Sequence, residues 1–565
     1  MIEQFYDLRP EVLALDRKAL DLCRAQFAHV EEIRDYNQLK MLRAFTDCGV
    51  EARHFWGSSG YGVWDDSRNK LEEVFARCMG AEAALVRPQF MSGTHTLTVA
   101  LFGLLRTGDT LLAATGRPYD TLEGVIGIGD AGKGCGTLRE FGVNYDECPL
   151  LPDFTPDYDL IAEKARTATV VHIQRSRGYT QRNAFDLATI QKVADTARKA
   201  NPNAVIFVDN CYGEFTQTAE PVAFGADIMA GSFIKNPGGG ITPTGGYIAG
   251  RKDLVEKCSH RFTAPGIGGD LGCTQDSLRD TFLGFYYAPG VVCEALKTAI
   301  YAQCLLELAG VNPVPRYTAD HNDIVTCFDS GSAAALTGFC AGIQHNSPVD
   351  SFASPEPADE PGYTDKVVMA SGSFTEGSTI EISCDGPLRA PYTCYLQGGV
   401  NFTAGRAAVL NAVQDHVKAL AVARTLADLP EIKRALALPP DSGIIQPVAS
   451  AVQKRNDLLF VVVTNMDGIR YSHPNADVIN HHFIGNDINP ALLGKENVSI
   501  NKGTLDAELT EALAEVIKAV RETGKKGAVT LTLNCAMLNT RDENTMKITP
   551  KVSRTIPELD RADTI

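Results

Sequence analysis

The sequence predicts an α/β protein, with a mostly parallel sheet covered by helices on both faces and smaller α+β segments after it. Between about residues 65 and 295, helical stretches alternate with short apolar runs that have the length and composition of strands. This alternation is typical of a parallel sheet, because each parallel connection needs a crossover helix. The predicted strands are 84–86, 110–113, 169–173, 205–208 and 247–249.

The segments on either side of this region complete the predicted fold in order. Residues 10–46 carry apolar residues at helical spacing, and a loop rich in glycine and aromatic residues follows at 54–62. After 296, a helix, a proline-rich loop (347–362) and a strand at 379–383 predict a smaller α+β domain. We therefore expect a helical segment with an aromatic loop (1–64), a large domain (65–295) and a small domain (296–415).

After about residue 415 the composition changes, and two further segments are expected at 416–499 and 500–565. The first has an Ala/Leu-rich helical stretch at 419–437, broken at Pro430, and a strand at 458–463. The second has one predicted helix at 505–520 and two β-like runs. Together they predict an α+β tail.

Composition narrows the class of protein. The 565 residues exceed a single core, and 44% hydrophobic with 22% charged residues is ordinary for a globular protein. The net charge of −16 argues against nonspecific nucleic-acid or anionic-membrane partners. No apolar run reaches transmembrane length and no signal peptide is visible. The 15 cysteines contain no Cys-x-x-Cys pair, so we expect reduced thiols and a cytoplasmic location.

A lysine and an aspartate carry the strongest chemical signal. Asp209 ends an apolar strand, and Lys235 follows 26 residues later in the turn 232–240 (SFIKNPGGG). Pyridoxal 5′-phosphate (PLP) needs such a pair, because a lysine holds it as a Schiff base and a carboxylate keeps its pyridine nitrogen protonated. A lysine in a loop of small residues is more often solvated. The preceding strand and the residues upstream favour the PLP hypothesis.

Two groups of small residues are candidate phosphate ligands. Ser92, Gly93 and Thr94 follow a strand and open a helix, where free backbone N–H groups bind anions. Ser232, three residues before Lys235, is a second candidate. Taken alone, an ordinary helix cap explains the tripeptide better.

Four more residues are candidates for cofactor or substrate contacts. Tyr119 follows a strand and could stack on the pyridine ring, although a surface or core tyrosine is the commoner case. His172 and Gln174 end another strand and could contact the ring oxygen or the substrate; a satisfied core histidine is an equal alternative. Arg389 could clamp a substrate α-carboxylate, because guanidinium binds carboxylate bidentately, but a solvated arginine is its alternative.

Three other patterns are set aside. The Gly-x-Gly-x-x-Gly run at 127–132 follows a helical stretch rather than a strand, and its continuation lacks the Ser/Thr of a Walker A loop. His473, His481 and His482 have no Cys or carboxylate partner at ligand spacing, so no metal site is expected.

Five distinctive motifs occur in order along residues 1–415: 54–62 (HFWGSSGYG), 87–95 (RPQFMSGTH), 116–123 (GRPYDTLE), 208–215 (VDNCYGEF) and 231–239 (GSFIKNPGG). In these motifs the chain resembles the methionine γ-lyase family, also called the aluminium-resistance family, a branch of the fold-type I PLP enzymes. The resemblance implies a fold-type I PLP-dependent transferase-like architecture and a homodimer or homotetramer with a shared active site. Tyr61 would then reach the phosphate of the neighbouring subunit.

The tail resembles two other proteins. Residues 416–499 are similar to the start of the PAS-like domain of citrate/dicarboxylate sensor kinases, which would put Arg470 and His473 on anion-binding positions. Residues 500–565 weakly resemble small phage-encoded proteins. Two fragments behind a complete enzyme indicate a fusion, and we expect the tail to be dispensable for catalysis.

The resulting prediction is a PLP-dependent carbon–sulfur lyase acting on a sulfur amino acid, in the manner of methionine γ-lyase. Lys235 would act as base at Cα, and Tyr119 as the acid that protonates the departing sulfur. Two alternatives stay open: a β-eliminating cysteine desulfhydrase-like or transsulfuration enzyme, and a silent PLP-fold scaffold attached to a carboxylate-binding sensor fragment.

Overall fold

The computed structural model describes residues 1–414, 430–436, 438–439, 443–455, 463–464, 469–473, 479–482, 528–539 and 542–555. The chain divides near residue 424 into two compact units, and residues 1–414 all lie in the first. Within the described ranges, no helix is both long enough and apolar enough to cross a membrane.

The first unit is built on a seven-stranded sheet with the order β1-β7-β6-β5-β4-β2-β3. Neighbours from β6 through β3 pair in parallel, and only β7 runs against the rest. The predicted, mostly parallel sheet is therefore confirmed. Its strands are β1 Ala83–Arg87, β2 Thr110–Ala113, β3 Asn144–Glu147, β4 Val170–Gln174, β5 Val205–Asp209, β6 Ile228–Ser232 and β7 Gly246–Gly250.

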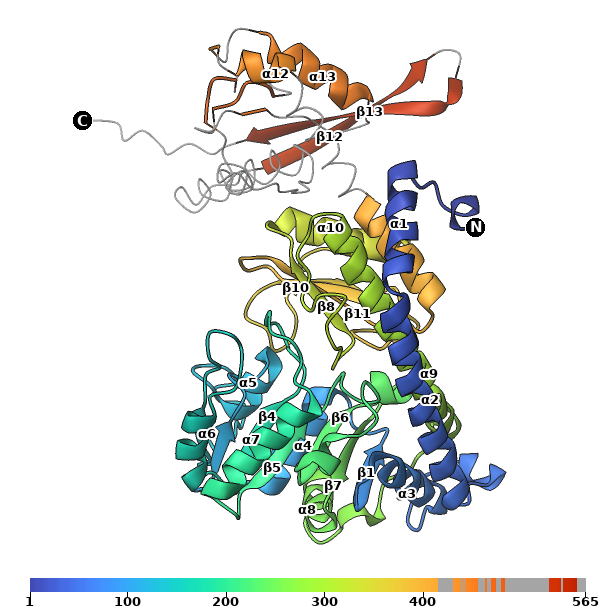
Figure 1. Ribbon diagram of the computed structural model, residues 1–565, viewed down its shortest axis with the longest axis vertical. Helices are drawn as coiled ribbons and strands as arrows, with labels where there is room; N and C mark the ends of the chain where they lie inside the picture. Colours follow the sequence, from blue (N-terminus) through green and yellow to red (C-terminus); the bar gives the residue numbers. More distant parts are fainter. Residues whose placement is uncertain are drawn as a thin grey trace, which may run out of the picture. The chain divides into compact units, whose positions relative to one another are not determined.

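Helices cover both faces of this sheet (Figure 1). Alternate residues of a strand point to opposite faces, so Val171 of β4 joins one apolar cluster while its neighbour Val170 joins another. The first cluster includes α3 Asp66–Met79, α7 Leu187–Ala200 and α9 Leu278–Leu308, and the second includes α4 Gly93–Leu104, α5 Asp120–Ile126 and α8 Lys252–Phe262. A further short helix, α6 Tyr158–Lys164, packs on α7.

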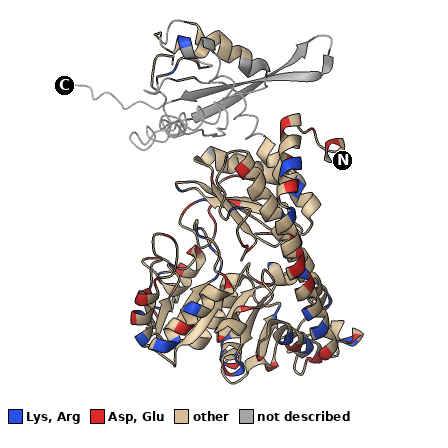
Figure 2. Ribbon diagram, viewed as in Figure 1, with Lys and Arg blue, Asp and Glu red and all other residues tan. Residues whose placement is uncertain are grey.

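The N-terminal helices connect the large and small domains. The helices expected over 10–46 are confirmed as α1 Pro10–Leu22 and α2 Arg24–Asp47. Both pack along the long helix α9, which Figure 1 shows beside them. Figure 2 shows charged residues of both signs interspersed along these outer helices.

The small domain is a four-stranded antiparallel sheet with the order β8-β11-β10-β9. The helix α10 Ala333–His345 and a helix over 402–414 belong to the same region. Its strands are β8 Val325–Asp329, β9 Val367–Ala370, β10 Ser383–Pro387 and β11 Thr393–Gln397.

Several strands differ from the prediction, and β8, β9 and β11 of the small domain were not predicted. β3 and β6 were not predicted, because β3 is a half-exposed edge strand of polar sequence (NYDE) and β6 contains small residues (IMAGS). The prediction of a strand at 379–383 is wrong, since β10 begins only at Ser383. The backbone N–H of Ile380 instead donates to the carbonyl of Ile234, beside Lys235, at 3.2 Å.

In the second unit, the described residues form two helices, a hairpin and isolated β-bridges between the segments 463–464, 469–473 and 479–482. α12 Pro430–Ala435 begins at the proline expected to break the helical stretch, as suits a residue without an N–H at a helix start. α13 is Ile445–Arg455, and β12 Ala528–Asn539 pairs antiparallel with β13 Asp542–Thr555. The helix expected at 505–520, most of the strand expected at 458–463 and the start of the 419–437 helix lie outside the described residues.

Candidate active site

A cavity of about 240 Å³ lies at the carboxyl edge of the large sheet. Gln174, Asp209 and Ser232 are the last residues of the adjacent strands β4, β5 and β6, and all three line it. Ligands of open α/β sheets bind at this edge, because every parallel strand presents its next side chain there. From the small domain the cavity is lined by Val325, Tyr363, Ser378, Asp385, Tyr395 and Gln397.

Lys235 reaches this cavity from the turn after β6. Its ammonium Nζ donates to the Tyr212 hydroxyl and, at 3.2 Å, to the carbonyl of Ser378. The same Nζ lies 3.9 Å from the centre of the Tyr212 ring. The lysine is therefore held between the large and small domains.

Tyr212 was not predicted from the sequence, although it follows Asp209 by only three residues. Its backbone is left-handed, with φ +68°, which is uncommon for a bulky residue and persists where the surroundings enforce it. Asn236, next to Lys235, donates from Nδ2 to the Tyr212 carbonyl at 3.0 Å. Burial raises the pKa of Tyr212 well above its ordinary value, so its phenol stays protonated.

Asp209 is buried at the end of β5, and its Oδ1 accepts the backbone N–H of Cys211 at 3.1 Å. Burial raises the pKa of this carboxyl, while the Cys211 N–H and the positive charge of Lys235 oppose that shift. A positively charged partner would thus favour the carboxylate form.

The start of α4 and the end of β6 form a cradle that suits a phosphate. Ser92 caps α4, its Oγ accepting the His95 N–H at 3.1 Å, and Gly93 opens the helix. A Cβ on Gly93 would lie 3.5 Å from the Ser232 Cβ, so glycine keeps the space between them open. The Ser232 Oγ is buried without a hydrogen-bond partner. An anion at the helix N-terminus would satisfy that hydroxyl.

Tyr119 and Gln174 contact each other in the cavity lining. The Gln174 Oε1 accepts the backbone N–H of Tyr119 at 2.8 Å, and the Tyr119 hydroxyl lies 3.0 Å from that of Tyr363. Burial raises the pKa of Tyr119, so it too remains a proton donor. Thr94 also lines the cavity, with its Oγ1 2.7 Å from the Thr121 Oγ1.

Three predicted residues do not line the cavity. His172 is buried against Phe207, and burial lowers its pKa to about 4, so its imidazole is neutral. Arg389 is 41% exposed and pairs with Asp120 at 3.2 Å and Asp365 at 3.0 Å. Tyr61 is 79% exposed in the aromatic loop.

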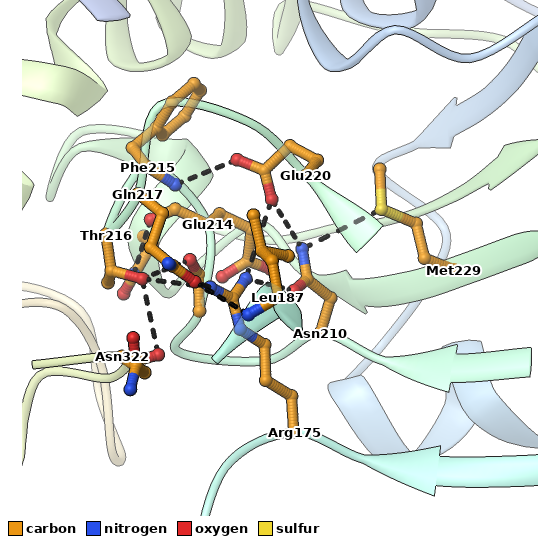
Figure 3. Close-up of polar contacts among 12 residues, drawn as sticks. Arg175, Leu187, Asn210, Glu214, Phe215, Thr216, Gln217, Glu220, Met229 and Asn322 are labelled. Atoms are coloured by element: carbon orange, nitrogen blue, oxygen red, sulfur yellow. Dashed lines mark hydrogen bonds and ion pairs between the residues drawn. The ribbon is translucent and has the colours of Figure 1, made fainter. Parts of the chain in front are cut away.

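A network of buried polar side chains lies next to the ends of β4 and β5 (Figure 3). Arg175 and Glu220 are fully buried, 3.7 Å apart, and Asn210 bridges them through 2.8 and 3.0 Å hydrogen bonds. Asn236 donates to the carbonyl of Glu214 at 2.9 Å. The residues that follow Asp209 and Lys235 in the chain are thus tied to one rigid set of contacts.

Glu214 also belongs to this network, and burial strongly shifts the pKa of its carboxyl group. Its Oε1 accepts the Tyr247 hydroxyl at 2.6 Å, while its Oε2 is buried without a partner. Burial raises the pKa of Glu214 to about 8. Across the described part of the chain, no group of three or more His, Cys, Asp or Glu side chains is arranged to hold a metal ion.

Known proteins match the tail as two separate pieces. Over 88 residues the chain is 60% identical to the sensor histidine kinase DcuS of Escherichia coli K12, which is 16% of this chain and 16% of DcuS. Residues 498–565 match the YfdP family. The tail therefore joins two fragments of different relationship, as expected for a fusion.

The region that contains the cavity matches one family throughout. Residues 12–417 match the methionine gamma-lyase family. The uncharacterized protein YnbB of Bacillus subtilis 168 is 43% identical over 385 residues, 68% of this chain and 91% of YnbB. The structure of a carbon-sulfur lyase involved in aluminum resistance from Clostridium novyi NT is 44% identical, with a TM-score of 0.70 over 73% of this chain and 97% of that one. The chain belongs to the methionine gamma-lyase family and has its fold-type I α/β architecture.

Proposed function

We propose that this protein is a PLP-dependent carbon–sulfur lyase that acts on a sulfur-containing amino acid. The observation that carries the proposal is the convergence of Lys235, Asp209 and the phosphate cradle on one cavity. The buried Ser232 hydroxyl, at the end of β6 beside the start of α4, has no hydrogen-bond partner among the described residues and fits an anionic group from outside the chain. The relationship to the Clostridium novyi carbon-sulfur lyase supports the reaction class.

Each group has a role that follows from its position. Ser92, Gly93, Thr94 and Ser232 would bind the phosphate, and Asp209 would hold a proton on the pyridine nitrogen. Bound PLP supplies an electron sink for negative charge developing at the substrate Cα. Lys235 would hold the cofactor covalently and, once released, take the Cα proton at Nζ.

Two tyrosines are placed to move or hold protons. Tyr212 contacts Lys235 Nζ, so it would orient the amine between its two tasks. Tyr119 lines the same cavity, and its buried phenol would protonate the departing sulfur. Whether the thiol leaves from Cβ or Cγ depends on a further proton removal at Cβ.

The test is the visible spectrum of the purified protein, before and after amino acids are added, followed by product analysis. We expect an absorption band from a lysine-bound cofactor that shifts with substrate. Methionine would give methanethiol, 2-oxobutanoate and ammonia in γ-elimination, whereas cysteine would give hydrogen sulfide, pyruvate and ammonia in β-elimination.

A protein that stays colourless with added PLP would overturn the proposal. If citrate or another dicarboxylate then raised the melting temperature while amino acids did not, the silent scaffold with a sensor fragment would be the better account.

The shared active site is a proposal of the same kind. Tyr61 lies in the aromatic loop at 54–62, and Trp56 in that loop and Trp64 just after it are also largely exposed, 75% and 80% respectively. A second subunit covering this loop would bury these rings. The test is the mass of the native protein by light scattering, beside a Tyr61→Phe variant assayed for PLP affinity.

A further inference from the structure

The charges that line the cavity are unbalanced. Among the described lining residues, Lys235 is the only basic side chain, and the acidic ones are Asp209 and Asp385. The proposed function uses Lys235 and Asp209 to bind the cofactor. Asp385, on the small-domain side, has no role in it, and an unused carboxyl group in a substrate cavity needs a reason.

Asp385 is 7% exposed and has unused hydrogen-bonding capacity. Its Oδ2 accepts the Tyr179 hydroxyl at 3.0 Å and the Ser378 hydroxyl at 3.3 Å. Among the described residues, no side chain donates a hydrogen bond to its Oδ1. Neither partner is charged, so among the described residues Asp385 forms no ion pair within 4.0 Å, although buried acids are ordinarily paired.

Several tyrosines line the same cavity as Asp385, and one of them, Tyr179, donates its hydroxyl to it. Tyr179 packs on Tyr363 and on Tyr395, with ring centres 5.6 and 4.9 Å apart, and Tyr119 lies beside Tyr363. All four line the cavity. The face of an aromatic ring attracts cations, and a carboxylate among such rings strengthens that preference.

Burial raises the pKa of Asp385 to about 6, and the charge of Lys235 partly opposes this shift. The carboxyl is thus close to titrating near neutral pH, and a cation beside it would favour its charged form. By linkage, the carboxylate would bind that cation in return.

We propose that Asp385 and the tyrosines around it form a subsite for a positively charged amino group on the sulfur substituent of the substrate. The preferred substrate class is then a thioether amino acid with a second ammonium group beyond the sulfur, in preference to methionine, whose substituent is an uncharged methyl group. This inference rests on the proposed function and narrows its substrate.

The test compares two ligands of equal length. S-(2-aminoethyl)-L-cysteine carries a terminal ammonium where S-propyl-L-cysteine carries a methyl group. Dissociation constants are taken from the shift of the cofactor's visible band after rapid mixing, so the readout does not depend on turnover. In the wild-type holoenzyme we expect the cationic ligand to bind roughly ten- to a hundredfold more tightly, as for a hydrogen bond to a charged group.

Asp385→Asn keeps the shape and removes the charge, so the preference should fall about tenfold or more while S-propyl-L-cysteine binds as before. Asp359→Asn is the matched control, because Asp359 is a small-domain carboxylate that is 89% exposed. It should leave both constants unchanged.

The wild-type measurement alone can overturn the inference, even if Asp385→Asn fails to fold. A tyrosine-lined apolar pocket without a cation subsite would bind S-propyl-L-cysteine at least as well. If Asp385→Asn weakened the binding of both ligands equally, Asp385 would act as a counter-ion of Lys235 and not as part of a cation subsite. In either case the visible band persists and the proposed function stands; a wild-type protein without the band overturns both.

Discussion

The two walls of the cavity come from different kinds of structure. On the large-sheet wall, Gln174, Asp209 and Ser232 end three neighbouring parallel strands. On the small-domain wall, Ser378 and Asp385 come from a loop and an antiparallel strand, and Tyr363 from another loop. The first wall is specified locally by strand-end motifs. The second exists only once the small domain has packed against Lys235, and it is the wall that we assign to substrate selection.

If the large-sheet wall carries the chemistry, its strand-end carboxylate should matter most. We expect Asp209→Asn to lower kcat by about 10³-fold, because an amide cannot hold the ring nitrogen protonated. Steady-state kinetics on a sulfur amino acid, with bound PLP quantified, would measure this. Asp227→Asn, which precedes β6 at the opposite end of the sheet, is the control. If Asp209→Asn lowered kcat by less than tenfold, the Asp209 carboxylate would have no essential role in the reaction.

The tyrosines sharpen the contrast between the walls. Tyr212→Phe should lower kcat by roughly 10²-fold, because the phenol at Lys235 Nζ orients the base. Tyr363→Phe, on the small-domain wall, should raise KM more than it lowers kcat. The measurement is the kcat and KM of both variants. A larger kcat loss in Tyr363→Phe than in Tyr212→Phe would assign the chemistry to the small-domain wall instead.

The network behind the large-sheet wall predicts a pH-dependent stability. The pKa of Glu214 is about 8 in the folded protein against 4.5 for an ordinary glutamate, so the folded state retains a proton that the unfolded chain releases. Stability from this group is therefore present below pH 4.5 and is lost as the pH rises toward 8. Glu214→Gln should have the same melting temperature as the wild type near pH 4.5 and a melting temperature a few degrees higher than the wild type at pH 8. A difference independent of pH would mean that Glu214 is charged in the fold.

The smallest effect is expected from the tail. The family match ends at residue 417, and the Clostridium novyi relative is covered almost completely without the tail. A chain ending at Val417 should keep its kcat, KM and PLP content. Lost activity in a truncated protein that is still folded by circular dichroism would make the tail part of the enzyme.

The sequence predicted residues of the large-sheet wall better than residues of the small-domain wall. The position of Asp209 at the cavity could be predicted because the apolar strand before it fixes where its last side chain lies. Lys235 and Ser232 were predicted from the turn at 232–240 and its spacing from Asp209, because a lysine and a carboxylate suit PLP. Tyr212 was missed because its position depends on a left-handed backbone held by Asn236, which no hydrophobic period reports.

On the small-domain wall, the error at 379–383 has the same origin. The alternation of that segment is typical of a strand, but Ile380 bonds to the Lys235 turn instead of a strand neighbour. Asp385 was missed because only tertiary packing brings it to the cavity. Arg389 was chosen for its chemistry, and its partners Asp120 and Asp365 lie outside the cavity lining.

The most direct test of the central claim is where the cofactor attaches. The protein is loaded with PLP, reduced with borohydride, digested and analysed by mass spectrometry beside Lys235→Ala. We expect one modified peptide, carrying the adduct on Lys235, and none in the variant. An adduct on a different lysine, or no adduct in a protein that binds PLP, would contradict the assignment of this cavity as the active site.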